Sequence, residues 1–97
     1  MESNQINFYY SQLSRYSKVI RDKYLSSDVR NHFLHDLCNF KDQQNLNTNS
    51  VLLFFKLLQN EFNIDQTLTY DEYRDLFKLG DFLQVKKFLI NLNQYFN

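Results

Sequence analysis

The sequence lacks most of the residues that interrupt helices or crosslink a chain. Its 97 residues include no Pro, one Gly, one Cys and no Trp. Because Pro and Gly are the strongest helix breakers, their scarcity predicts a mostly helical structure. A single Cys excludes an internal disulfide, which fits a reducing compartment.

An excess of charge of one sign and long apolar segments are also missing. Eleven basic and eleven acidic side chains cancel, whereas nucleic-acid binders usually carry a basic excess that displaces counterions. No basic stretch leads into an apolar one, as in a secretory signal. No apolar run approaches the roughly 20 residues of a membrane span. We therefore expect an intracellular protein, cytoplasmic or nuclear, that binds neither nucleic acid nor membrane.

The sequence is rich in aromatic rings, with ten Phe and seven Tyr. A chain of this length forms one small domain with a modest core, and large rings supply much buried area per residue. Residues 51–58 are apolar except for Lys56. A helix that is apolar nearly all round lies at the centre of a domain. We therefore expect this segment to be the central helix, with Phe54 in the core.

Different segments of the N-terminal half predict a strand and a helix. Residues 6–10 are aromatic and rich in strand formers, so they favour a strand. Apolar residues then follow helical spacing from position 13 to position 25, with Ser11 as the cap. Residues 32–40 fit either a short strand or one helical turn, and periodicity alone does not decide between them.

Capping residues mark two helix starts. The polar cluster at residues 47–50 offers caps for the central helix. Thr69 and Glu72 have Ser/Thr-x-x-Glu spacing, so each can satisfy an open backbone donor of the other. This capping box predicts a helix that begins near residue 70.

The segment that follows contains a sequence motif, Leu79-Gly80-Asp81-Phe82-Leu83-Gln84-Val85. It resembles the last helical pair of the BTB/POZ domain, whose usual form is Leu-x-x-Ala-Asp-Phe/Tyr-Leu-Gln-Val. Residues 13–21 resemble another segment of that family, with Ser17 at its common Ser. Gly80 replaces the usual Ala, and both are small enough for two helices to approach closely. We therefore expect Gly80→Ala to be tolerated.

The resemblance implies an α+β fold of BTB/POZ type, mostly helical with a small sheet near the N-terminal half. It covers residues 6–97 as a single domain whose first strand is missing. The implied function is a non-enzymatic protein–protein interaction module that mediates self-association or recruits a partner. Because the first strand contributes to ordinary BTB homodimers, its absence argues against a dimer of that kind.

A cullin-binding role is a further implication, and one motif weakens it. In BTB proteins that recruit a cullin, the central helix tends to carry an apolar-x-Glu motif. The matching residues here are Leu52-Leu53-Phe54, with no acid. A degenerate ubiquitin-ligase adaptor stays open as an alternative. A small all-helical regulatory or inhibitor protein is the alternative outside this family.

The last helix carries the candidate partner surface. Its apolar residues span a wider arc than one helix face can bury against a small core. Exposed apolar patches on soluble proteins mark partner sites, and homodimerisation is the simplest way to cover this one. A missing downstream domain or fraying of the terminus is the competing interpretation. The predicted partner-binding residues are Phe88, Leu92, Tyr95 and Phe96.

The candidate metal and catalytic residues are few. His32, His35 and Cys38 are the one cluster of zinc-ligand types, but a structural zinc site needs four ligands. A reactive thiol needs an electropositive setting and an oriented base, and nothing around Cys38 supplies them. With one Gly the chain has no phosphate-binding loop. We expect no metal, no cofactor and no enzymatic activity.

Overall fold

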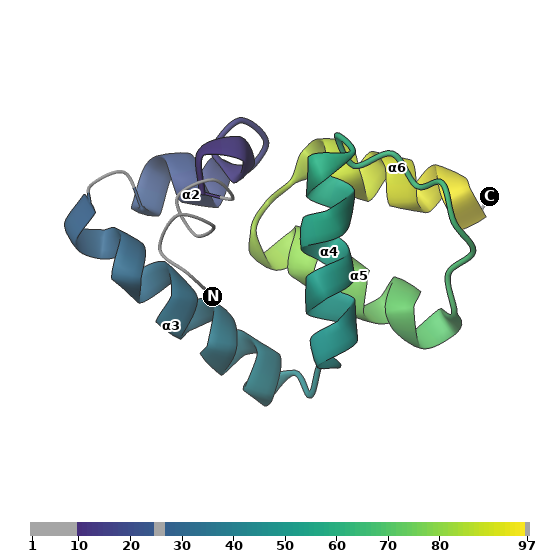
Figure 1. The fold of residues 1–97 in the computed structure, drawn as a ribbon, viewed down its shortest axis with the longest axis horizontal. Coiled ribbons are helices and arrows are strands. Elements are labelled where there is room, and N and C mark those ends of the chain that lie inside the picture. The colour runs from purple at the N-terminus through teal and green to yellow at the C-terminus, as the bar shows by residue number, and fades with distance from the viewer. Residues whose placement is uncertain (1–9, 25–26, 97) are drawn as a thin grey trace.

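The computed structural model describes the backbone of residues 10–24 and 27–96, and the side chains of the same residues apart from 27–31 and 96. Every regular element in these ranges is helical. A helical turn at residues 10–13 precedes the first labelled helix. In Figure 1, α2 and α3 form one side of the molecule, and α4, α5 and α6 form the other. The helices are α2 (Lys18–Lys23), α3 (Ser27–Gln43), α4 (Thr48–Gln59), α5 (Tyr70–Phe82) and α6 (Lys86–Phe96).

The predicted α+β fold is wrong, because the described residues contain no strand. The nearest feature is an isolated antiparallel bridge between Ser17 and Val85. Most of the predicted strand at residues 6–10 lies outside the described residues, and Tyr10 belongs to a helical turn. Residues 32–40 lie within α3, where Phe33 and Leu37 are buried one turn apart. Aromatic enrichment favours strands only when a sheet surface receives the rings, and here helix faces receive them.

Both predicted capping sites are confirmed. Thr69 Oγ1 accepts the amide of Glu72 at 3.2 Å, and Glu72 Oε1 accepts the amide of Thr69 at 2.9 Å. The cap of α4 is Asn47, whose Oδ1 accepts the amide of Asn49 at 2.8 Å. These bonds satisfy donors that the first turn of each helix leaves open.

The single helix expected from residue 13 to residue 25 is interrupted at residues 14–17, so Ser17 and not Ser11 caps α2. The Ser17 hydroxyl accepts the amide of Ile20 at 3.1 Å and donates to the carbonyl of Leu83. A hydroxyl has one donor and two acceptor positions, so one buried side chain performs both tasks. Ser17 therefore joins the start of α2 to the turn between α5 and α6.

The α5–α6 turn brings two helices close together at Gly80. A Cβ atom added to Gly80 would lie 2.9 Å from Phe88 Cδ2 and 3.0 Å from Leu89 Cδ2. The predicted close approach is confirmed. However, the space is too small for the methyl group of Ala. The ring of Phe88 cannot easily move away, because it is fully buried against other rings. The expectation that Ala is tolerated is therefore reversed.

Helix α4 occupies the centre of the molecule, as its composition predicts. Phe54 is fully buried, and its ring centroid lies within 5.4–5.6 Å of those of Phe55, Phe62 and Phe88. These rings come from α4, the loop after it and α6, so the cluster joins three segments. Helix α5 packs against both α4 and α6.

A polar contact links α2 to α3. The Tyr24 hydroxyl donates to Asp36 Oδ2 at 2.5 Å, and Lys23 Nζ lies 3.7 Å from the same carboxylate. The hydrogen bond from Tyr24 lowers the pKa of Asp36, and burial of the Tyr24 hydroxyl raises its pKa. Asp36 is therefore ionised and Tyr24 protonated at neutral pH.

We expect Phe54→Ala to lower the free energy of unfolding by about 3–5 kcal/mol, because it empties the centre of a close-packed core. Leu52→Ala is the matched control in the same helix, since 57% of the Leu52 side chain is exposed. It should cost less than about 1 kcal/mol. Urea denaturation measures both, and equal losses would show that the Phe54 ring is not central.

We expect Gly80→Ala to lower stability by about 1 kcal/mol, because overpacking costs about 1–3 kcal/mol and the gain in helix propensity offsets about 1. On a Phe88→Leu background the same change should cost less, since the contacting ring is gone and only the contact with Leu89 remains. A double-mutant cycle by thermal unfolding measures the difference. A higher melting temperature for Gly80→Ala in the parent would contradict this interpretation.

Candidate functional site

The structure places two of the four predicted partner-binding residues inside the molecule. Phe88 and Leu92 are fully buried in the core, so in this fold neither presents a surface. Tyr95 is exposed, and its hydroxyl accepts the amide of Leu68 at 3.0 Å. The side chain of Phe96 lies outside the described residues. The sequence analysis treated α6 as covered on one side, whereas α5 and the loop after α4 both cover it.

An apolar groove lies between α3 and α4. It has a volume of about 310 Å³. Leu37 and Phe55 are buried at its floor, whereas Leu34 and Val51 are half-buried. Leu52, 57% exposed, stands on one wall. The lining residues are Leu34, Leu37, Cys38 and Lys41 from α3 and Val51, Leu52 and Phe55 from α4.

The groove opens because α3 and α4 diverge from a short shared loop (Figure 1). Asn45 in this loop has a positive φ of 54°, a conformation that Asn tolerates better than most residues. The next residue, Leu46, is buried and anchors the loop in the core. The chain thus reverses within a few residues. The faces of α3 and α4 that line the groove are left partly uncovered.

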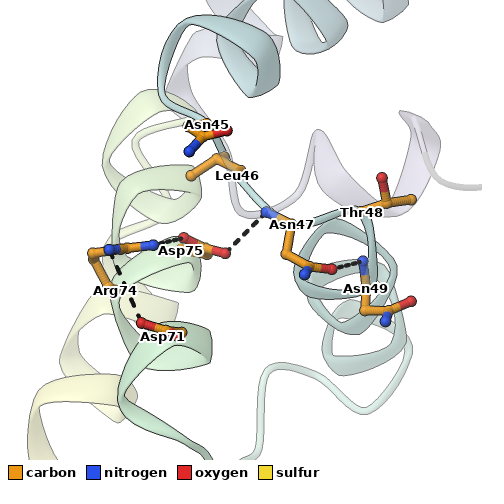
Figure 2. Close-up of a pocket in the computed structure, with 8 residues that line it drawn as sticks. All are labelled: Asn45, Leu46, Asn47, Thr48, Asn49, Asp71, Arg74 and Asp75. Atoms are coloured by element: carbon orange, nitrogen blue, oxygen red, sulfur yellow. Dashed lines mark hydrogen bonds and ion pairs between the residues drawn. The ribbon is translucent and has the colours of Figure 1, made fainter.

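Asp75 of α5 holds this loop in place. Its carboxylate is 1% exposed and accepts the amide of Asn47 at 3.1 Å. Figure 2 shows the carboxylate pointing from α5 toward the loop, with Arg74 beside it. Arg74 lies 3.4 Å from Asp75 and 4.0 Å from Asp71. The bond to Asn47 fixes the residue that caps α4, and so fixes the angle at which α4 leaves α3.

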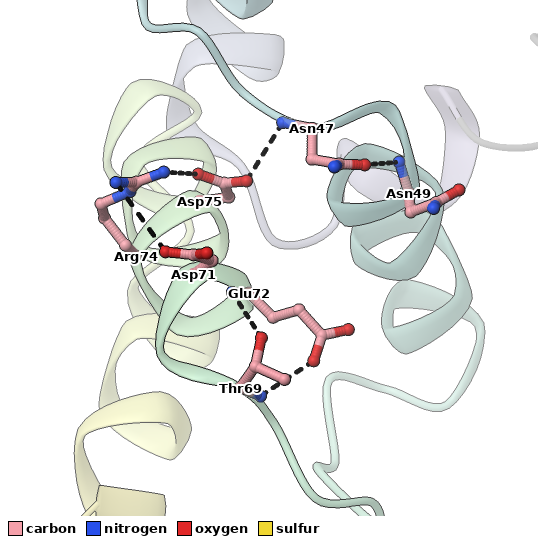
Figure 3. A network of polar contacts seen from close by, with 7 residues as sticks. All are labelled: Asn47, Asn49, Thr69, Asp71, Glu72, Arg74 and Asp75. Carbon is pink, nitrogen blue, oxygen red and sulfur yellow. Dashed lines mark hydrogen bonds and ion pairs between the residues drawn. The ribbon is translucent and has the colours of Figure 1, made fainter.

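A polar pocket of about 460 Å³ surrounds this contact. Its fixed charges are one guanidinium between two carboxylates, from Arg74, Asp71 and Asp75. Figure 3 shows these groups beside the Asn47–Asn49 pair that caps α4 and above the Thr69–Glu72 pair that caps α5. Each charge faces an opposite one and the buried carboxylate is bonded to backbone, so the pocket is a structural brace for the two helix starts.

A second apolar surface was missed by the sequence analysis. Tyr70, Tyr73 and Phe77 follow one another at intervals of three and four residues along α5, and so share a face. Tyr70 is 74% exposed and Phe77 48% exposed. Arg74 and Lys78 lie beside them in a shallow pocket of about 210 Å³. The apolar spacing of Tyr73 and Phe77 is visible in the sequence, but spacing alone does not report which side of α5 the rest of the molecule covers.

The candidate metal residues lie on the surface of α3. His32, His35 and Cys38 recur every three residues and all three are exposed. Among the side chains described, no cluster of three or more His, Cys, Asp or Glu could hold a metal ion. Nor does any helix in the described ranges have both the length and the apolar character to cross a membrane.

No family model, curated protein or solved structure matches this chain. The BTB/POZ resemblance therefore rests on the quoted phrases alone, and the fold implied by it is not the fold observed. Function must be inferred from the two apolar surfaces and the brace that positions one of them.

We expect Asp75→Ala to lower the free energy of unfolding by about 1–3 kcal/mol, because the amide of Asn47 loses its acceptor. Asp75→Asn keeps an acceptor oxygen in the same place and should cost less, since Arg74 is partly exposed and can be solvated. Chemical denaturation of both variants measures the difference. Equal losses would show that the ion pair, and not the bond to the loop, is what matters.

Proposed function

We propose that this chain is a small all-helical regulatory protein that acts without catalysis, by binding another protein in the groove between α3 and α4. The observation that carries the proposal is the groove itself, with the side chain of Leu52 left largely in solvent. The BTB fold has no part in the proposal, because the described residues contain no sheet. Its basis is the exposed surface and not the family resemblance.

The shape of the groove favours an amphipathic helix as its occupant. Its two walls are helices that diverge from one end, and its lining is apolar apart from Lys41 and Cys38. Grooves of this type receive apolar side chains at positions i, i+3 or i+4 and i+7 of a partner helix. The groove volume lies at the lower end of the range for ligand pockets, roughly 300–1,000 Å³, so a few side chains fill it.

Lys41 adds a charge preference. Its ammonium group lies 4.0 Å from the carboxylate of Asp42, which is largely exposed. Exposed pairs of this kind contribute little, typically about 0–1 kcal/mol, so a carboxylate from a partner can take the place of Asp42. The preferred partner segment is therefore an apolar helix face with an acidic residue at the end that meets Lys41.

We expect a displayed library of amphipathic helical peptides, selected on this protein, to yield apolar residues at that spacing with an acidic residue beside them. Leu52→Glu should raise the Kd of the selected peptides tenfold or more, a loss of about 1.4 kcal/mol in binding free energy. The reason is that it places a carboxylate in the apolar wall of the groove. Tyr70→Glu, the same kind of change at an exposed position outside the groove, should leave affinity unchanged.

Cys38 gives a local readout, since it is the one cysteine of the chain and lies exposed on the groove wall. A peptide bound in the groove should slow the reaction of this thiol with a thiol-reactive dye. Peptides that bind Leu52→Glu as tightly as the parent, and do not protect Cys38, would place the binding site elsewhere and overturn the proposal.

A further inference from the structure

The aromatic face of α5, defined as Tyr70, Tyr73 and Phe77, is a separate surface from the α3–α4 groove. The rings of Tyr73 and Phe77 lie with their centroids 6.4 Å apart at an interplanar angle of 30°. They form a ridge that Tyr70 extends toward the start of the helix. Tyr73 is half-buried and packs against the core, whereas Tyr70 and Phe77 are exposed. Two large exposed rings on one helix face mark an interaction surface.

The charges beside this face are arranged so that the face complements itself. Asp71 and Lys78 are seven residues apart, two helical turns, and so lie on the same edge of α5. The side chain of Asp71 is 79% exposed, and its partner Arg74, 4.0 Å away, is also partly exposed. Exposed pairs of this kind contribute little to stability, so Asp71 can also meet a lysine of a second copy. Lys78 takes part in none of the ion pairs found among the described residues. An antiparallel copy of the same helix would bring each of these two charges against its opposite.

We propose that the aromatic face of α5 binds the same face of a second copy of this chain, with the two helices antiparallel. A two-fold axis between positions 74 and 75 brings Lys78 of each copy to Asp71 of the other. The same axis brings Phe77 of one copy between Tyr70 and Tyr73 of the other. Such an interface is closed and self-complementary, as in most homodimers.

The charge of the chain and of the helix favours a second copy over other occupants. The net charge is zero, so two copies do not repel each other as charged bodies. Helix α5 carries four acidic residues against Arg74 and Lys78, which disfavours nucleic acid even though aromatic rings are present. An acidic peptide would meet the same carboxylates, apart from that of Asp75, which is buried.

The aromatic face of α5 is small for a protein–protein interface. A 13-residue helix is about 20 Å long, at 1.5 Å per residue, and offers less than the roughly 800 Å² per partner of a standard interface. The dimer is therefore weak, and it forms at high protein concentration.

Sedimentation of the parent from about 10 µM to about 1 mM should show a shift from monomer to dimer, as for a small interface. Lys78→Glu alone and Asp71→Lys alone should each remain monomeric, because each places like charges in contact twice. An equimolar mixture of the two variants should form a 1:1 dimer, because both charge contacts are then restored. Lys56→Glu, at an exposed position on α4, is the control and should dimerise as the parent does.

Circular dichroism checks that each variant keeps its helices, and Phe77→Glu tests the face without touching the charge pair. A parent that stays monomeric throughout the range would overturn the proposal. So would single variants that still self-associate, or a mixture that stays monomeric. Leu52→Glu should dimerise like the parent, so failure of this interface and failure of the groove are separate results.

Discussion

The packing of the Phe54 ring against Phe62 and Phe88 is the contact on which the rest of the structure depends. It joins α4 to the loop that follows and to α6. Phe62 reaches the cluster with a positive φ of 61°, a conformation that costs a bulky residue about 1–3 kcal/mol. Burial of three rings offsets that strain, and once the cluster forms, α5 is held between α4 and α6.

Sequence reasoning succeeded where local chemistry decides and failed where distant packing decides. The cap at Asn47 and the capping box at Thr69 need only neighbouring residues, so both could be predicted. The same is true of the buried middle of α4. The predicted sheet, which the described residues do not contain, rested on aromatic enrichment and on a family motif. Neither specifies what the rings pack against.

The candidate surfaces also depend on contacts between segments that are distant in sequence. Phe88 was predicted to lie in a partner surface because the apolar arc of α6 is wider than one helix face can bury against a small core, yet distant segments enclose it. Leu52 was predicted to be buried because α4 is apolar nearly all round, yet the divergence of α3 uncovers it. That divergence depends on Asp75, 28 residues beyond the loop that it holds. No pattern within α3 or α4 reports this constraint, so the groove could be found only in the folded chain.

The hydroxyl of Ser17 has a consequence for how the chain acquires its structure. It caps α2 and also bonds the carbonyl of Leu83, 66 residues later. The buried donor at the start of the chain therefore has no partner until the turn between α5 and α6 exists. Such distant contacts form late, because a long loop must close first. During synthesis, α2 therefore lacks this contact until Leu83 has left the ribosome and the turn between α5 and α6 has formed.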